Sequence, residues 1–174
     1  MSRTPYDLTL IRGIVYDVDG VLSPQTIPLG LDGRPMRMVN IRDGYAMQLA
    51  AKRGLRQAII TGGDSGEVAT RFRGLGIKDV FLKAALKRPV LEQWMQAEGL
   101  KPEEVAFVGD DIPDIPAMRY VGLSVCPRDA APEVRETAVY ISPVNGGYGV
   151  ARDLLEQILA AKGEWMSDIN AFGW

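Results

Sequence analysis

The stretch Asp17-Val18-Asp19-Gly20-Val21 follows directly on the apolar run Ile14-Val15-Tyr16. This run is short and rich in β-branched residues, which is typical of a buried strand. Two carboxylates at the carboxyl end of a strand, followed by a glycine, lie where open α/β sheets place their chemistry. If both face the crevice, their repulsion favours a bound cation or a shared proton, and Mg²⁺ is a cation that prefers oxygen ligands. A surface turn in which the two Asp residues only cap the next element explains this stretch alone equally well.

Three further segments follow the same plan and favour the first interpretation. The apolar run Ala58-Ile59-Ile60 ends in Thr61-Gly62-Gly63, and a later apolar run ends in Gly109-Asp110-Asp111. Between them, Lys87 begins a predicted helix whose first turn contains Pro89, a residue that suits that position. A nucleophilic carboxylate, a hydroxyl beside glycine amides, a cation and a second acidic cluster are groups that phosphoryl transfer uses. The sequence therefore indicates an enzyme that handles phosphate.

Strand and helix patterns alternate along the whole chain. They predict an α/β, Rossmann-like fold, with a parallel sheet and helices on both of its faces, in a single domain over residues 1–174. Glycines stand where helices are expected to end, at Gly54, Gly76 and Gly99. The predicted strands lie at about 12–17, 55–60, 79–82, 105–109, 122–126 and 138–142. The predicted helices lie at about 43–53, 64–74, 88–98, 114–120 and 149–162.

One segment, about residues 24–40, interrupts this alternation. Its centre, Leu31-Asp32-Gly33-Arg34, carries the Asp-Gly pair that is typical of a β-hairpin turn. A two-stranded hairpin is marginally stable alone and leaves its edges unpaired. We therefore expect a small β-hairpin here, and self-association of the protein through it.

Charge and hydrophobicity limit the classes of partner that the protein is expected to bind. The 174 residues carry a net charge of −2, and Lys and Arg form no run or stripe, which argues against a nucleic-acid partner. No apolar stretch reaches the length of a membrane span, and the start Met-Ser-Arg-Thr-Pro lacks the hydrophobic region of a signal peptide. We therefore expect no membrane partner and a cytoplasmic location.

The absence of histidine and the single cysteine limit the catalytic mechanisms that the protein can use. Histidine is absent from the sequence, which excludes Ser-His-Asp triads and zinc sites built on histidine. Acid–base catalysis is then left to carboxylates, Lys or Tyr. The lone Cys126 ends a short apolar run and has no second Cys to pair with. We expect it to be a buried, inert thiol.

In order and spacing, four motifs resemble those of the haloacid dehalogenase superfamily of phosphatases. They are Asp17-x-Asp19, Thr61, Lys87 and Gly109-Asp110-Asp111. Many members carry an inserted cap domain, whereas the segment 24–40 has room only for a hairpin. The chain is similar, over about residues 10–164, to a capless branch of this superfamily, the 3-deoxy-D-manno-octulosonate 8-phosphate (KDO 8-phosphate) phosphatases. Further matching stretches are Val39-Asn-Ile-Arg-Asp-Gly-Tyr45 and Asn145-Gly-Gly-Tyr-Gly-Val-Ala-Arg-Asp153.

The resemblance implies a catalytic role for each motif. Asp17 would attack phosphorus and form an aspartyl-phosphate. Asp19 would protonate the leaving oxygen and then activate water, while its backbone carbonyl binds Mg²⁺. Asp110 would supply the second carboxylate of the metal site, beside that of Asp17. Lys87 would neutralise charge on the phosphoryl group as a further catalytic residue.

Other positions would support the phosphate and the metal. Thr61 and Gly62, together with Lys87, would hold the phosphate oxygens at the N-terminus of a helix. Asp111 would bind a metal-bound water or orient Lys87. Asp114 lies where a helix begins, so that capping this helix and a role behind the metal ligands are both good interpretations.

Substrate contacts are expected from Asp19, Asn40, Arg42 and Arg71, and Arg42 suits a sugar-acid carboxylate. Solvent-exposed positions on helices would account for Arg42 and Arg71 almost as well as contacts with the substrate. The chain departs from the pattern of the KDO 8-phosphate phosphatases at Gly63, because these enzymes commonly have Arg directly after Thr-Gly. Phosphatases of nine-carbon keto-deoxy sugar acid 9-phosphates tend to have an acid there. The nine-carbon substrate is therefore an alternative to the eight-carbon one, which is a precursor of lipopolysaccharide.

Assembly is the last property that the resemblance implies. Members of the branch are homotetramers in which a neighbour covers the open site. A non-catalytic tetramerisation module is therefore an alternative to an enzyme. The tail, about residues 164–174, carries unusual aromatic residues that either dock on a neighbouring subunit or form a flexible end. Its large apolar residues are Trp165, Met166, Phe172 and Trp174.

Overall fold

Strand β1, Gly13–Tyr16, lies near the middle of a six-stranded parallel sheet in the computed structural model, which describes residues 3–173. The strand order is β3-β2-β1-β4-β5-β6. The other strands are β2 (Arg56–Ile60), β3 (Asp79–Phe81), β4 (Val105–Val108), β5 (Leu123–Cys126) and β6 (Tyr140–Ile141). The predicted parallel α/β sheet is thereby confirmed.

The register of the central strands decides where the polar side chains meet. Tyr16 of β1 lies opposite Ile59 of β2 and Val108 of β4. The residues that follow these strands therefore leave the sheet at nearly the same level. Because β1 stands between β2 and β4, the Asp17 motif lies between the other two strand ends.

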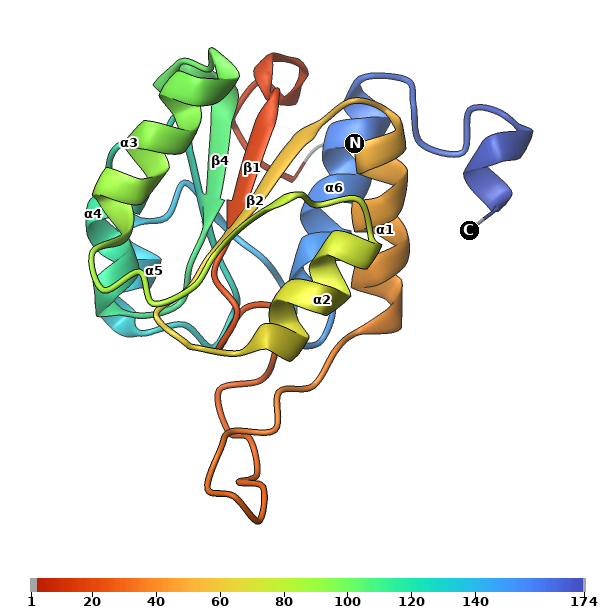
Figure 1. Ribbon diagram of the computed structural model, residues 1–174. Coiled ribbons are helices and arrows are strands. Elements are labelled where there is room, and N and C mark those ends of the chain that lie inside the picture. The colour runs from red at the N-terminus through yellow and green to blue at the C-terminus, as the bar shows by residue number, and fades with distance from the viewer. Residues whose placement is uncertain (1–2, 174) are drawn as a thin grey trace.

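Helices cover both faces of the sheet (Figure 1). Ile14 and Tyr16 pack in one core, whereas Val15 between them packs in the other. This explains why every position of β1 is apolar, since a central parallel strand is buried on both sides. The helices on the first face are α1 (Ile41–Lys52), α2 (Gly66–Gly74) and α6 (Val150–Ala161). Those on the second face are α3 (Lys87–Glu98), α4 (Ile115–Met118) and α5 (Pro132–Thr137).

The sequence pattern did not predict α5, and the helix predicted at about 114–120 is longer than α4. Both are short helices with a proline in the first turn, Pro116 and Pro132. One turn or two of helix contains too few residues to show a helical period, so a sequence pattern does not reveal it. The three glycines expected at helix ends do adopt positive φ, at Gly54, Gly76 and Gly99.

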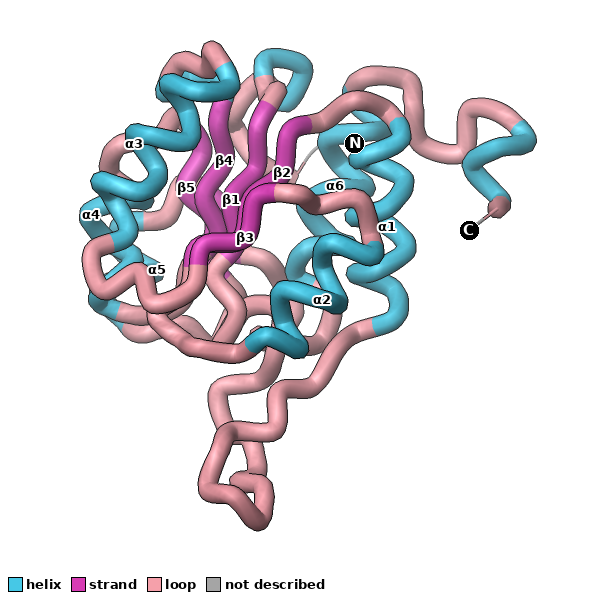
Figure 2. The backbone as a smooth tube through the Cα atoms, in the orientation of Figure 1, coloured by secondary structure: helices cyan, strands magenta, loops and turns pink. Residues whose placement is uncertain are grey.

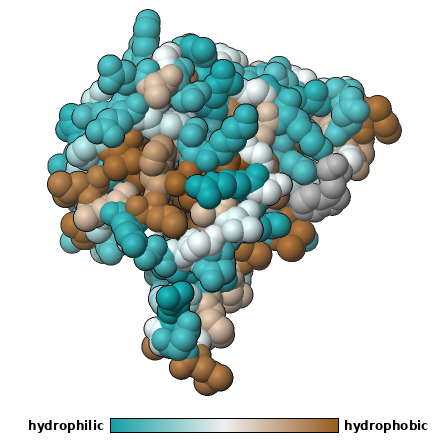
Figure 3. All heavy atoms as spheres, viewed as in Figure 1, coloured by the Kyte–Doolittle hydropathy of each residue, from teal (hydrophilic) through white to brown (hydrophobic). Residues whose placement is uncertain are grey.

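Residues 24–40, called the projecting loop from here on, extend away from the body of the protein (Figure 2). The chain reverses as predicted, but the predicted two-stranded hairpin is reduced to a single bridge between Leu29 and Pro35. Pro28 and Pro35 lack the N–H groups that a longer ladder would need. Hydrophobic side chains gather at the far end of the loop (Figure 3). Its exposed apolar residues include Leu29, Leu31, Met36 and Met38.

The tail begins by folding back on its own chain. Trp165 packs edge-on against Tyr45 of α1, with ring centroids 6.1 Å apart, and the Arg152 guanidinium lies 4.5 Å from the Trp165 ring. Phe172 is exposed. The expected contact of Trp174 falls outside the described residues. Both described ends of the chain lie beside the helices α1 and α6, away from the projecting loop at the bottom of the view (Figure 1). Across residues 3–173, no helix has the length and hydrophobicity to cross a membrane.

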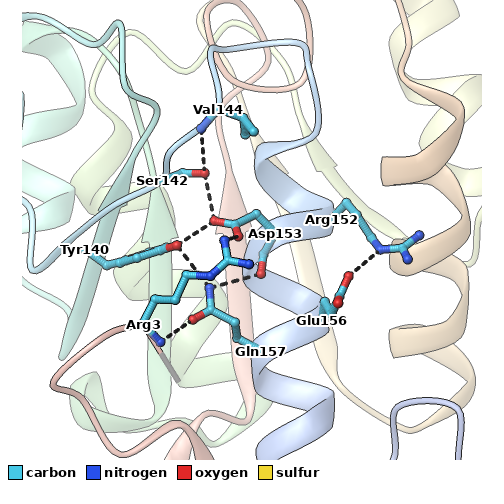
Figure 4. Close-up of polar contacts among 8 residues, drawn as sticks. All are labelled: Arg3, Tyr140, Ser142, Val144, Arg152, Asp153, Glu156 and Gln157. Carbon is cyan, nitrogen blue, oxygen red and sulfur yellow. Dashed lines mark hydrogen bonds and ion pairs between the residues drawn. The ribbon is translucent and has the colours of Figure 1, made fainter. Parts of the chain in front are cut away.

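A buried polar network ties the N-terminal segment to α6 and β6 (Figure 4). The Asp153 carboxylate accepts hydrogen bonds from Arg3 at 2.8 Å, Tyr140 at 2.7 Å and Ser142 at 2.8 Å. Gln157 extends the network, because its Nε2 donates to Tyr140 at 3.1 Å and its Oε1 accepts from the Arg3 backbone.

Asp153→Ala is expected to lower the free energy of unfolding by about 2–4 kcal/mol, because it leaves the buried hydroxyls of Tyr140 and Ser142 without their acceptor. Urea unfolding followed by circular dichroism measures this. Glu156→Ala on the same helix removes an exposed ion pair to Arg152 and serves as the control, with an expected loss below about 1 kcal/mol. Equal losses for the two variants would contradict a structural role for this network.

Candidate active site

The motif residues meet at the carboxyl edge of the three central strands. Asp17 follows β1 and its backbone N–H donates to the carbonyl of Val108 in β4. Thr61 follows β2, and Asp110 comes two residues after β4. All three side chains are buried, and Asp17 and Asp110 line one hollow of about 560 Å³ together with Asp19 and Lys87. This hollow is called the acidic hollow below.

Lys87 joins two acids at the base of the acidic hollow. Its Nζ lies 2.8 Å from Oδ2 of Asp17 and 2.6 Å from Oδ1 of Asp114. The other oxygen of Asp114 accepts the backbone N–H groups of Asp110 and Asp111. The predicted alternative in which Asp111 orients Lys87 is therefore wrong, because Asp114 does so and Asp111 is exposed.

Local backbone geometry explains why Asp114 holds this position. The turn Ile112–Asp114 brings its side chain back under the end of β4. A Cβ added at Gly109 would lie 2.4 Å from the Cβ of Asp114, so only glycine at 109 leaves room for this approach. Asp114 thus accepts backbone N–H groups at the start of a helical turn and also holds Lys87, the predicted catalytic lysine. Both interpretations that the sequence left open for Asp114 are therefore compatible with its position.

Electrostatics at the base of the hollow favour a cation. Burial, together with the neighbouring carboxylate of Asp114, raises the pKa of Asp17 to about 6. Burial, with Asp17 and Asp114 nearby, raises the pKa of Asp110 to about 8. Burial opposes the charged form of Lys87, but the carboxylates of Asp17 and Asp114 outweigh it and raise its pKa. Three buried acids thus share one lysine, and the excess negative charge calls for a further cation.

The oxygen atoms present fit a magnesium ion. Oδ1 of Asp110 is buried and has no hydrogen-bond partner among residues 3–173. Carboxylate oxygens of Asp17, Asp110 and Asp114 lie within 4.8 Å of one another. Asp114 already uses both of its oxygens, so Asp17 and Asp110 are the acids left for a metal. An oxygen-only set without Cys or His suits Mg²⁺ rather than Zn²⁺.

The Asp19–Gly20 peptide lies beside these acids. Gly20 has a φ of +83°, and a Cβ added there would lie 1.9 Å from Oδ2 of Asp110. The carboxylate of Asp110 therefore packs directly on the backbone of Gly20. This contact places the preceding peptide, which carries the Asp19 carbonyl, next to the acids as the metal prediction requires.

The predicted phosphate-binding residues Thr61 and Gly62 lie in the turn that follows β2 and precedes α2. The Oγ1 of Thr61 accepts the backbone N–H of Gly63 at 3.2 Å, which fixes the turn after β2. Around Gly62 no heavy atom of the described chain would contact an added Cβ. The helix α2 begins only at Gly66, with Ser65 as its N-cap. The helix therefore begins two residues later than predicted, and the phosphate-binding role of Thr61 and Gly62 stays a prediction.

A second hollow lies between the projecting loop and α2. It has a volume of about 1010 Å³ and is called the arginine groove below, because Arg34, Arg37 and Arg71 line it. Arg71, a predicted substrate contact, is half-buried there. Arg42, another, is exposed on α1 and lines neither the arginine groove nor the acidic hollow.

Asn40 caps α1 by accepting the backbone N–H groups of Arg42 and Asp43, and it donates to the carbonyl of Gly147. Its substrate role therefore stays a prediction. Two residues of the projecting loop were missed by sequence reasoning. Gln25 donates to the carbonyl of Asp129 and lies 3.5 Å from Oδ2 of Asp110, and Arg37 pairs with Asp19. For Arg37 the alternation Met36-Arg37-Met38 was the available signal, because neighbours in an extended segment point to opposite sides.

Comparison with known proteins agrees with this geometry. Residues 40–122 match the family of haloacid dehalogenase-like hydrolases. A 3-deoxy-D-manno-octulosonate 8-phosphate phosphatase of Escherichia coli K12 is 37% identical over 154 residues, which cover 88% of this chain and 82% of that protein. The chain belongs to the haloacid dehalogenase-like hydrolases.

Solved structures of this family show how closely the fold is shared. A phosphatase of the same name from Yersinia pestis superposes with a TM-score of 0.87 and 34% identity, over 91% of this chain and 85% of that one. One from Moraxella catarrhalis, in complex with magnesium ion, phosphate ion and KDO, gives a TM-score of 0.89 and 29% identity, over 96% of each chain. The family and the fold predicted from the sequence are confirmed.

Magnesium affinity is expected to rise with pH. The folded protein holds its protons on Asp110 up to about pH 8 and on Asp17 up to about pH 6, far above the usual 3.8. The folded state therefore binds more protons than the unfolded state between about pH 4 and pH 8. The stability of the metal-free protein falls as pH rises through this range. Mg²⁺ has to displace these protons, so its binding strengthens over the same range.

Thermal unfolding with and without a fixed concentration of Mg²⁺ measures this coupling. We expect a larger Mg²⁺-induced rise in Tm at pH 8 than at pH 6, and no rise in Asp110→Asn at either pH. A rise in Tm that is independent of pH would contradict the displacement of protons by the metal.

Proposed function

We propose that this protein is a Mg²⁺-dependent phosphatase that hydrolyses KDO 8-phosphate to the free sugar acid and phosphate. One observation carries the proposal. Lys87 bridges Asp17 and Asp114 at the end of the central strands, and beside them lies the buried Oδ1 of Asp110, which has no hydrogen-bond partner in the described part of the chain. This arrangement supplies a carboxylate nucleophile and positive charge for a phosphoryl group at one point.

The reaction takes two steps in this geometry. The Asp17 oxygen that is not paired with Lys87 attacks phosphorus, and the bond from phosphorus to the sugar oxygen breaks. Asp19 donates a proton to that leaving oxygen. It then takes a proton from the water that attacks the aspartyl-phosphate, which releases phosphate and restores Asp17. When bound, Mg²⁺ supplies charge that stabilises the transferring phosphoryl group, with Asp17, Asp110 and the Asp19 carbonyl as its ligands.

The names of the relatives support the chemistry and the substrate. Those reported above are phosphatases of the eight-carbon acid, and the Moraxella catarrhalis structure contains magnesium. The predictions of a phosphatase and of a Mg²⁺ cofactor are thereby confirmed, and the eight-carbon interpretation is favoured over the nine-carbon one. We assign the substrate-side roles to Asp19 and Arg71, which line the acidic hollow and the arginine groove, and keep Thr61 and Gly62 as phosphate-binding residues.

Initial rates on three phosphate esters test the proposal. We expect the highest kcat/KM for KDO 8-phosphate, a lower value for a nine-carbon keto-deoxy acid 9-phosphate and the lowest for ribose 5-phosphate. Chelation should remove all three activities and Mg²⁺ should restore them. Absence of metal-dependent turnover of any ester would favour the alternative of a non-catalytic tetramerisation module.

We further propose a homotetramer in which projecting loops pair between subunits. The loop carries exposed apolar residues that a monomer leaves in water, and it is too small to close over Asp17 by itself. A cytoplasmic location stays an expectation from the sequence.

Replacing Leu29 and Leu31 together by Ser is expected to dissociate the assembly. These are exposed residues of the loop, and their apolar contacts would be lost at every subunit interface. Light scattering gives the mass of the particle in solution. Leu10→Ser, at an exposed apolar position of the body, is the matched control and should keep the wild-type mass. A wild-type monomer with full activity would contradict this assembly.

A further inference from the structure

Arg37 and Asp19 form a two-pronged ion pair. Nε of Arg37 donates to Oδ1 of Asp19 and Nη2 donates to Oδ2, both at 2.8 Å. The side chain of Arg37 is only 12% exposed, whereas that of Asp19 is 41% exposed. Both carboxylate oxygens of the proposed acid–base residue are therefore engaged with a guanidinium that the projecting loop supplies.

Gly63 makes room for this arginine. A Cβ added at Gly63 would lie 2.6 Å from Nη2 and 3.2 Å from Cζ of Arg37. A side chain at position 63 would push the guanidinium away from Asp19. The glycine after Thr61-Gly62 and the arginine of the loop are thus two parts of one arrangement.

The two members of the pair line different hollows. Asp19 lines the acidic hollow, in which phosphate chemistry is proposed, and Arg37 lines the arginine groove. A phosphate ester with its phosphorus at Asp17 has its leaving oxygen at Asp19. The rest of its carbon chain would then extend past Arg37 toward the groove.

We propose that Arg37 determines specificity by exchanging the carboxylate of Asp19 for the carboxylate of the substrate. This inference rests on the proposed function. Asp19 has to turn an oxygen toward the leaving group, so at least one of the two hydrogen bonds between Arg37 and Asp19 has to break. The planar fork of a guanidinium fits any carboxylate in the same two-pronged way. A sugar acid supplies the replacement and a neutral ester does not, so a neutral ester leaves a largely buried guanidinium without its partner if Asp19 moves.

Two phosphate esters that differ in a carboxylate test the exchange. Wild type, Arg37→Ala and Arg37→Lys are assayed with KDO 8-phosphate and with ribose 5-phosphate, and kcat and KM are measured separately. We expect Arg37→Ala to lose about 10- to 100-fold in kcat/KM for the sugar acid, the range for hydrogen bonds to a charged group. For ribose 5-phosphate we expect no loss, or a gain in kcat, because Asp19 is no longer held. Arg37→Lys should recover only part of the preference, since an ammonium lacks the fork.

Gly63→Ala tests the same arrangement without touching either charged residue. Its methyl group should displace Arg37 and reproduce the loss of preference, and Gly63→Ala combined with Arg37→Ala should lose no more than Arg37→Ala alone. Gly74→Ala is the matched control, because a Cβ there meets no described atom within 4 Å, and it should keep the wild-type preference.

Three outcomes would overturn the inference. Equal losses of Arg37→Ala on both esters would mean that Arg37 only positions Asp19. A preference for the sugar acid that survives in Arg37→Ala would refute the exchange while leaving the proposed function intact. A wild type without any preference for the sugar acid would refute the proposed function, and the exchange with it.

Discussion

Asp17→Asn is expected to lower kcat by a factor of the order of 10⁴ or more, the scale on which other hydrolases respond to the loss of a catalytic nucleophile. The amide has almost the shape of the carboxylate, but it neither attacks phosphorus nor carries the charge that a metal ligand needs. Lys87 keeps its contact with Asp114, so the fold has no reason to open. Burial raises the pKa of Asp17 to about 6, which means that its charged form costs stability at neutral pH.

Three measurements on Asp17→Asn follow from this. Steady-state assays should find almost no turnover, thermal unfolding without metal should give a Tm no lower than that of the wild type, and Mg²⁺ should no longer raise that Tm. Asp7→Asn, at an exposed cap near the amino edge of the sheet, is the matched control and should keep nearly all activity. Wild-type turnover by Asp17→Asn would refute the covalent route.

Asp114→Ala is expected to lower the free energy of unfolding by about 3–5 kcal/mol, the range for breaking a buried ion pair from one side. The change removes the acceptor of two backbone N–H groups and one of the two acids that hold Lys87. The lysine would then have only Asp17 to pair with. We therefore expect a loss of activity beside the loss of stability, because the ammonium is no longer held in place for the phosphoryl group.

The neighbouring Asp111→Ala is the comparison that makes this test sharp. Asp111 is exposed, and a change at such a position is expected to cost less than about 1 kcal/mol. Urea unfolding of the two variants side by side gives both values. If Asp111→Ala were the more damaging change, the assignment of Asp114 as the partner of Lys87 would be wrong.

The ends of the central strands were predictable from the sequence because each of these strands finishes in an apolar run that stops at a polar motif. Ile14-Val15-Tyr16 before Asp17 and the run before Gly109 have this form, and the parallel register then brings the motifs to one edge. The acidic cluster follows from this order alone. No knowledge of side-chain directions was needed for it.

Contacts that depend on turns were not predictable in the same way. Asp111 and Asp114 have the same side chain and lie in one short segment. Only the helical turn between them decides which carboxylate lies under β4. The pair of Arg37 and Asp19 joins residues 18 positions apart across a loop with a single bridge. Prolines at 28 and 35 limit that bridge, and the sequence gives the prolines but not the path of the loop between them.

The position of the chain ends has a practical consequence for the experiments above. Both ends of the described chain lie beside the helices α1 and α6, away from the projecting loop (Figure 1). An affinity tag, a fluorophore or an anchor to a sensor surface at either end should therefore leave the projecting loop free. Protein immobilised through one end should keep its assembly, whereas a label attached at Leu31 should interfere with it.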